Sequence, residues 1–152
     1  MKNTEIEKNK QAEKMADLTF ALLEQCQQKQ EQMANNLGLT VAEFKLFLSF
    51  RDDSSLSVGD LAKRMELSSS RLTRILDGLV EKKFVMRELG VNDRRTMKIT
   101  ITNAGKKIQH AIDQIYIKAH RDILDLLPPG ADESVIFAME KLHQAMKKWT
   151  IG

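Results

Sequence analysis

The sequence of 152 residues contains little cysteine, little proline and no long apolar segment. Its one cysteine, Cys26, excludes an intrachain disulfide framework and is compatible with a reducing compartment. No apolar run is long enough to cross a bilayer, and the polar, charged residues 1–14 resemble neither a signal peptide nor a membrane anchor. We therefore expect a cytoplasmic protein. Its length and its ordinary fractions of hydrophobic and charged residues suit one globular domain.

The sequence also lacks the motifs of catalysis and cofactor binding. It has no nucleophile elbow, no phosphate-binding glycine loop and no paired carboxylates in a supporting context. His110 and His120 lie ten residues apart, which does not suit an i, i+4 chelating pair, and there is no second cysteine to complete a tetrahedral site with His143. We therefore expect no enzyme activity, no cofactor and no metal, with the histidines at the surface or at an interface.

Basic residues are concentrated in the middle of the chain. Residues 61–107 contain 12 Lys and Arg against 5 Asp and Glu, whereas the remainder contains 12 against 16. A basic middle between acidic flanks is typical of a polyanion-binding surface carried on a scaffold that does not bind polyanions itself. A solvated charged face would give the same counts, so charge alone leaves both interpretations open.

Apolar periodicity and N-terminal caps predict six helices. The start signals are capping boxes at Thr4–Glu7 and Thr40–Glu43 and capping hydroxyls at Ser57 and Ser68. Pro128-Pro129-Gly130 ends the fifth helix, because proline can neither donate a backbone hydrogen bond nor continue the turn. The predicted helices run from 4 to 35 or 36, from 40 past 48, from 57 to 65, from 68 through 80, from 103 to 127, and from 132 onward.

One hairpin interrupts the helices. Residues 95–102 alternate apolar or basic side chains with threonines and a lysine, which is strand patterning. Residues 84–89 supply an antiparallel partner, and residues 90–94 supply the turn. We expect no other β-structure, and the fold class is therefore mainly α with a small β-hairpin.

The order of these elements predicts a winged helix-turn-helix. A short helix, a tight turn at 66–68 and the helix capped by Ser68 form the helix-turn-helix, and the hairpin that follows is the wing. The second helix must bury one face and present the other to a major groove. Its outward residues combine small hydroxyls, which allow close approach, with Arg71 and Arg74, whose forked donors suit guanine or phosphate.

The tip of the hairpin is suited to a minor groove, where negative potential is concentrated. Arg94 and Arg95 supply the charge, and Asp93 can hold the Arg95 guanidinium in place, although an ordinary turn salt bridge remains the alternative. The candidate DNA-binding residues are therefore Ser68, Ser69, Ser70, Arg71, Thr73, Arg74, Asp93, Arg94, Arg95 and Lys98.

Four segments together resemble the MarR family of winged helix-turn-helix transcription regulators. They are residues 67–76 (LSSSRLTRIL), Arg87, residues 93–95 (DRR) and residues 101–105 (ITNAG). The resemblance implies a homodimer joined through its N- and C-terminal helices, with recognition helices in successive major grooves of a palindrome. It also implies recognition-helix contacts by Ser70, Thr73 and Arg74.

The same resemblance makes Arg95 the wing arginine and Asp93 its orienting partner. Three positions depart from the family pattern. Lys83 stands where the family usually has glycine after the recognition helix, Gly78 lies inside that helix, and Arg71 occupies a site that is often a small residue.

We therefore expect one continuous domain with two regions. Residues 1–36 and 103–152 form the helical dimerisation region, and residues 37–102 form the winged helix-turn-helix. The predicted function is a bacterial transcriptional repressor that binds double-stranded DNA and is released by a small-molecule effector. A winged-helix protein-interaction module and a non-specific architectural DNA binder are the alternatives.

Two further features leave their roles open. Cys26 lies on the apolar face of the first helix without an adjacent cation, so we expect packing there and not a redox-sensing thiolate. The eight methionines and six phenylalanines either line an effector pocket or fill the core, and the sequence does not choose between them.

Overall fold

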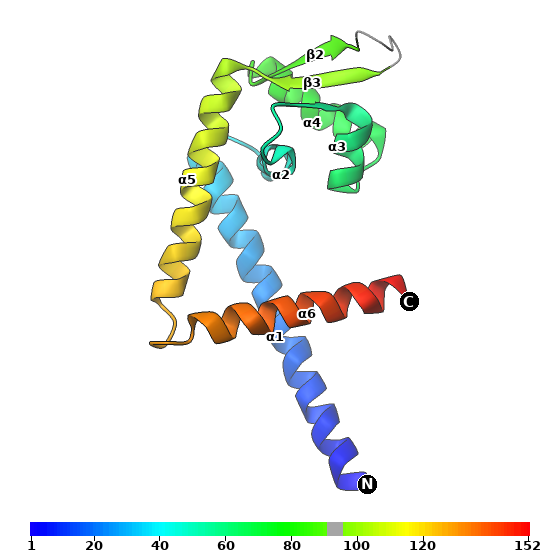
Figure 1. Ribbon diagram of the computed structural model, residues 1–152, viewed down its shortest axis with the longest axis vertical. Coiled ribbons are helices and arrows are strands. Elements are labelled where there is room, and N and C mark those ends of the chain that lie inside the picture. Colours follow the sequence, from blue (N-terminus) through cyan, green and yellow to red (C-terminus); the bar gives the residue numbers. More distant parts are fainter. Residues whose placement is uncertain (91–95) are drawn as a thin grey trace. The chain divides into compact units, whose positions relative to one another are not determined.

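The computed structural model describes residues 1–90 and 96–152, and the chain divides into two compact units, residues 1–113 and 114–152. The first unit contains α1 (Lys2–Asn36), α2 (Val41–Phe50), β1 (Ser55–Ser57), α3 (Val58–Met65), α4 (Ser69–Glu81), β2 (Val85–Leu89), β3 (Met97–Ile101) and the start of α5 (Asn103–Asp125). The second unit contains the rest of α5 and α6 (Asp132–Ile151). The elements are labelled in Figure 1.

The β-structure is a three-stranded antiparallel sheet in the order β1-β3-β2. The predicted hairpin is confirmed, with Arg87 opposite Ile99 and Glu88 opposite Lys98. The expectation of no other strand was wrong, because β1 pairs with β3 along three residues. The Ser55 hydroxyl also lies 3.1 Å from the Thr100 hydroxyl. A three-residue strand has no periodicity of its own, so only its partner 45 residues away could have revealed it.

The starts of α2, α3 and α4 follow the predicted caps. The Thr40–Glu43 capping box is present, with the Thr40 amide donating to the Glu43 carboxylate at 3.0 Å and the Glu43 amide donating to the Thr40 hydroxyl at 3.1 Å. The hydroxyls of Ser57 and Ser68 accept from the amides of Asp60 and Arg71. These side chains satisfy backbone donors that a helix leaves unpaired.

The start of α1 was predicted wrongly. The helix begins at Lys2 with Met1 as a cap that makes no side-chain bond, so the Thr4–Glu7 box does not form. Thr4 already lies inside the helix, so the amides that follow it donate to backbone carbonyls one turn earlier and not to its hydroxyl. The end at Asn36 is as predicted.

A single core holds the first unit together. The helix α2 packs against α1, α3 and α4, and α4 packs against α3 and β2. The largest fully buried side chains of this core include three phenylalanines of α2. The buried apolar residues are Met33, Ala34, Leu39, Phe44, Leu46, Phe47, Phe50, Leu61, Leu72, Leu76, Leu79, Val85, Ile99, Ile101 and Ile112. The methionines and phenylalanines therefore supply part of the core.

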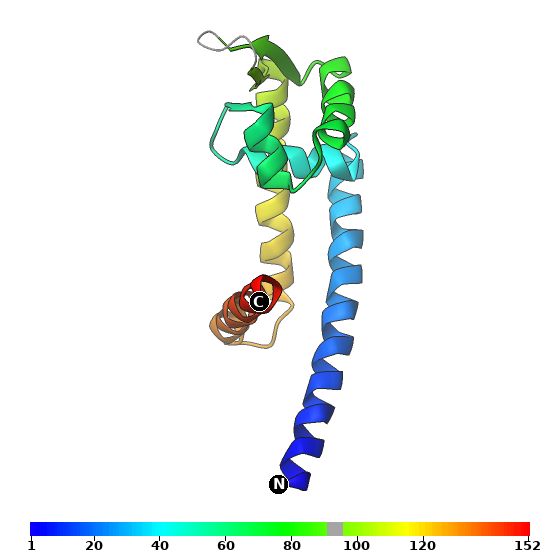
Figure 2. The ribbon, with the colours of Figure 1, turned by 90° about the vertical axis from the view of Figure 1, so that its right-hand side faces the viewer.

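Most of α1 takes no part in that core. Only Met33 and Ala34 of this 35-residue helix are buried, and the remainder extends from α2 as one rod (Figure 2). Cys26 is exposed, so the expectation that it packs inside the chain was wrong. The apolar face of α1 that carries Cys26 is not buried by any other part of this chain. Met15, Leu18 and Leu22 on it are each more than half exposed.

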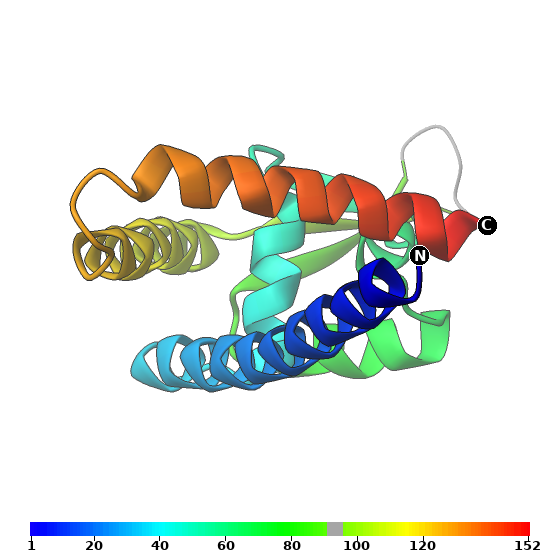
Figure 3. The ribbon, with the colours of Figure 1, turned by 90° about the horizontal axis from the view of Figure 1, so that it is seen from below.

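The second unit consists of the end of α5, a tight connection and α6 (Figure 3). The connection contains Pro128-Pro129-Gly130, and Gly130 takes a left-handed backbone with φ +78°. No side chain from residue 114 onward is buried, although α5 and α6 both carry large apolar side chains. No helix of the described residues is long and apolar enough to span a membrane.

Lys83 occupies the left-handed position that the sequence indicated. It follows the C-terminal end of α4 with φ +63°, where glycine would suffer no steric penalty from a Cβ atom. Its carbonyl accepts from the Thr102 hydroxyl at 2.7 Å, which fixes the start of α5 beside the end of α4. A lysine is therefore held in a conformation that favours glycine.

Lys83→Gly is expected to raise the free energy of unfolding by about 1 kcal/mol, because relief of the left-handed penalty of roughly 1–2 kcal/mol outweighs the cost of the greater unfolded-state entropy of glycine. Urea unfolding measured at one fixed protein concentration tests this. The control is Glu81→Gly at the exposed last residue of α4, which should lower stability by about 1 kcal/mol. Equal losses in both variants would contradict the prediction.

Candidate nucleic-acid interface

The helix α4 presents a polar ridge outward while its other face is buried. Leu72, Leu76 and Leu79 face the core. The turn before α4 is set by Glu66, which ends α3 in a left-handed conformation with φ +53°. The exposed residues from the cap to Asp77 are Ser68, Ser69, Ser70, Arg71, Thr73, Arg74 and Asp77, so the structure places them together on one helix.

Hydroxyl groups of this ridge are partly used by the helix itself. The Ser68 hydroxyl accepts from the Arg71 amide at 3.4 Å and lies 3.3 Å from the Ser70 hydroxyl. The Thr73 hydroxyl donates to the Ser69 carbonyl at 2.8 Å. Each hydroxyl keeps lone pairs or a rotatable proton that can still bond a neighbouring phosphate or base.

The two arginines of α4 are available for an external anion. Neither Arg71 nor Arg74 has an ion-pair partner within residues 1–90 and 96–152. Both border a surface hollow of about 570 Å³ between α2 and α4, whose other lining residues are Val41, Ala42, Lys45, Met65, Leu67 and Ile75.

Several other basic residues of the middle segment are engaged inside the molecule. Arg64 donates to the carbonyls of Ser49 and Phe50 at the end of α2 and to the Asp53 carboxylate at 2.8 Å. It therefore caps α2, as cations do at helix C-termini. Lys82 and Arg87 also have carboxylate partners. The excess positive charge of residues 61–107 thus overstates the charge that is free to meet a polyanion.

The hairpin places Lys98 on its outer face. Lys98 is exposed and lies opposite Glu88, whereas its neighbour Ile99 is buried on the other face of the sheet. The predicted wing residues Asp93, Arg94 and Arg95 lie outside the described residues. Lys98 is therefore the one candidate wing residue whose place in the fold is described.

An ion pair joins the hairpin to α4. The Arg87 guanidinium on β2 donates to the Asp77 carboxylate and, at 3.3 Å, to the Thr73 carbonyl. The family resemblance included Arg87, but the sequence did not reveal its pairing with Asp77. Ten residues and a chain reversal separate them, so the contact follows only from the packing of β2 on α4.

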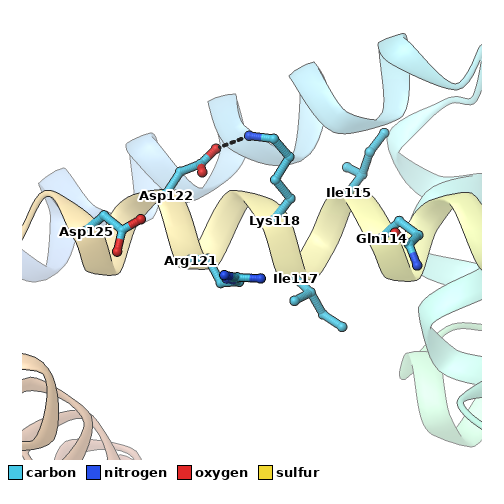
Figure 4. Close-up of a pocket in the computed structure, with 7 residues that line it drawn as sticks. All are labelled: Gln114, Ile115, Ile117, Lys118, Arg121, Asp122 and Asp125. Carbon is cyan, nitrogen blue, oxygen red and sulfur yellow. Dashed lines mark hydrogen bonds and ion pairs between the residues drawn. The ribbon is translucent and has the colours of Figure 1, made fainter.

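A second surface hollow lies along the end of α5. It has a volume of about 640 Å³, and every lining residue comes from residues 114–125 (Figure 4). Lys118 donates to Asp122 at 2.6 Å along the helix. One helix cannot enclose a ligand, so this hollow does not define a binding site. Within the described residues, no group of His, Cys, Asp and Glu side chains is arranged to hold a metal ion.

Comparison with known proteins identifies relatives of this chain. Residues 39–97 match the model of the MarR family. The HTH-type transcriptional regulator SarZ of Staphylococcus epidermidis is 33% identical over 78 residues, which cover 51% of this chain and 53% of SarZ. The chain is thus similar to the MarR family over residues 39–97. It spans about half the length of this curated relative, and the family model matches the chain from just before α2 to the first residue of β3.

Two solved structures share the fold over most of the chain. The YusO protein from Bacillus subtilis is 25% identical with a TM-score of 0.67, covering 86% of this chain and 95% of YusO. A mutant of Staphylococcus aureus MepR, bound to an oligodeoxyribonucleotide, is 20% identical with a TM-score of 0.59, covering 87% of this chain and 97% of MepR. These likenesses confirm a winged helix-turn-helix with long flanking helices.

Within the region that matches the MarR family, a buried carboxylate joins the start of α2 to the end of α4. Glu43 is 5% exposed, and its Oε2 accepts from the Lys82 ammonium at 2.6 Å. The same ammonium donates to the Gly38 carbonyl at 3.1 Å. Lys82 at the end of α4 is thereby joined to the start of α2 and to the turn that follows α1.

This network explains Gly78, which looked costly inside a helix. A Cβ atom at Gly78 would lie 2.7 Å from Glu43 Oε1, so glycine lets the carboxylate approach α4 closely. The helix loses about 1 kcal/mol relative to alanine at this position. The absence of a Cβ atom at Gly78 leaves room for the Glu43 carboxylate to bind Lys82.

Proposed function

We propose that this chain is a sequence-specific DNA-binding transcriptional regulator whose α4 enters a major groove. The observation that carries the proposal is the capped α4 with an exposed hydroxyl ridge and two arginines that have no ion-pair partner in the described residues. Ser70, Thr73 and Arg74 would read base edges and nearby phosphates, and Ser68 and Ser69 would lie at the positive N-terminal end of the helix dipole. The solved structure of a MepR mutant with an oligodeoxyribonucleotide supports the proposal.

The wing would bind the neighbouring minor groove. We assign this role to Arg94 and Arg95, with Asp93 orienting Arg95, on the strength of the sequence resemblance. Lys98, exposed on β3, would contact phosphate. Arginine suits a narrow groove, because its planar charged group fits where negative potential is highest.

We infer that the working form is a homodimer. The uncovered apolar side chains of α1, α5 and α6 include Phe20, Leu23, Ile123, Phe137 and Trp149, each at least 45% exposed in the single chain. The unit formed by residues 114–152 has no buried side chain of its own, so it lacks a core without a partner. A second copy would cover these faces with two-fold symmetry that matches a palindromic operator.

Repression is the regulatory mode that we propose. A dimer across a promoter would exclude other proteins from that DNA, and its two recognition helices would lie about 34 Å apart, one turn of duplex. An effector that altered this spacing would change affinity by about 5- to 150-fold. Size-exclusion chromatography with light scattering tests the dimer, and a monomer at micromolar concentration would contradict it.

Selection from a pool of random duplexes tests sequence-specific binding. We expect rounds of binding and amplification to enrich an inverted repeat whose half-sites are centred about 10 base pairs apart. A pool that stays random while binding strongly would indicate an architectural protein. A chain that retains no duplex at low salt would leave only the protein-interaction alternative.

A further inference from the structure

A carboxylate lies on the face of α4 that we assign to DNA, and this inference rests on that proposed function. Ser69, Thr73 and Asp77 follow one another at four-residue intervals and form one exposed ridge. The Asp77 side chain is 58% exposed. An uncompensated negative charge at this place would repel DNA phosphates. The effect of Asp77 on DNA binding therefore depends on whether a cation neutralises it.

Arg87 supplies the compensating charge from β2. One nitrogen, Nη2, donates both to the Asp77 carboxylate and to the Thr73 carbonyl. Arg87 lies opposite the buried Ile99, and cross-strand partners project from the same face of a sheet. The side chain of Arg87 is therefore on the core side of the sheet, where it reaches α4.

This arrangement distinguishes Arg87 from the arginines of α4 itself. Arg71 and Arg74 have no ion-pair partner among the described residues, whereas Arg87 is paired and 31% exposed. An exposed ion pair contributes little to the stability of a fold. The contact does, however, join β2 to the middle of α4. It also neutralises the positive charge of Arg87, which would otherwise be attracted to phosphate.

We propose that Asp77 and Arg87 are a pair of positioning residues that set DNA specificity. The pair holds β2 at a fixed angle to α4, and it withholds Arg87 from the phosphate backbone. Binding then depends on the fit of α4 and the hairpin to one sequence more than on charge. Neither residue reads a base.

The test uses the full-length protein, the duplex obtained by selection and a scrambled duplex of the same length. Fluorescence-anisotropy titrations at several salt concentrations give two quantities: the ratio of the two affinities and the slope of log affinity against log salt. For Arg87→Ala we expect the ratio to fall about tenfold with an unchanged slope, because no phosphate contact is lost.

Asp77→Ala should give a different signature. Freed Arg87 would bind phosphate, so we expect affinity for the scrambled duplex to rise, the slope to steepen by about 0.9, and the ratio to fall. The double variant Asp77→Arg/Arg87→Asp restores an ion pair and should recover the ratio. Asp52→Ala, which removes an exposed carboxylate from the loop between α2 and β1, is the control and should leave the ratio unchanged.

Two results would overturn the proposal. One is a ratio that does not change in either single variant. The other is an Arg87→Ala slope that becomes shallower by about 0.9, which would make Arg87 a phosphate ligand. A wild-type protein that does not distinguish the two duplexes would instead refute the proposed function, so the two failures are separable.

Discussion

Arg74→Ala is expected to weaken binding to the selected duplex by about 5- to 150-fold, equivalent to roughly 1–3 kcal/mol for an arginine that reads a base. Arg74 is exposed on the ridge of α4 and has no ion-pair partner within residues 1–90 and 96–152, so the change removes no internal ion pair. The loss should be larger for the selected duplex than for a scrambled one, because base contacts carry the discrimination.

Two matched variants separate the charge of Arg74 from its shape. Arg74→Lys keeps the charge but loses the forked donors, so it should retain affinity for scrambled DNA and lose preference at one base pair. Arg121→Ala removes the same charge from exposed α5 and should leave both affinities unchanged. An Arg74→Ala protein that binds like wild type would show that the ridge of α4 is not the reading surface.

Lys82→Met is expected to lower the free energy of unfolding by about 2 kcal/mol, because it removes the charged partner of a nearly buried carboxylate. Glu43 is 5% exposed and would keep only the bond from the Thr40 amide at its Oε2 atom. The Lys82 side chain is 36% exposed, so we expect less than the roughly 3–5 kcal/mol typical of fully buried pairs. Urea unfolding followed by circular dichroism at constant protein concentration measures the loss.

Comparison with a double variant identifies the cause of that loss. Glu43→Gln/Lys82→Met replaces both charges and should be more stable than Lys82→Met alone, because no buried charge is left without its partner. If the two variants are equally unstable, the cost comes from lost packing at Lys82 and not from the ion pair.

Local signals predicted most of the fold. The capping residues Thr40, Ser57 and Ser68 each act within three residues of themselves, so their effect could be seen in the sequence. The apolar spacing of α4 likewise showed which of its faces is buried, and the outward residues are exposed as expected. The sequence has Lys83 where the family usually has glycine, and the left-handed backbone of Lys83 confirms that glycine would suit this position.

Features that depend on distant partners were not predicted. The strand β1 exists because β3 offers it a free edge, and the pairs Asp77–Arg87 and Glu43–Lys82 form only when separate elements pack. Gly78 appeared to be a departure from the family pattern until the Glu43 carboxylate was found beside it. Cys26 lies on an apolar stripe that the chain does not cover, which periodicity alone cannot distinguish from a buried one.

The measurement that tests the central claim most directly is an anisotropy titration of the wild-type protein against the selected duplex and its scrambled counterpart, at physiological salt and at lower salt concentrations. The account predicts a preference of about 10³ or more at physiological salt, as expected of a specific regulator. Equal affinity for the two duplexes, falling together as salt rises, would contradict it.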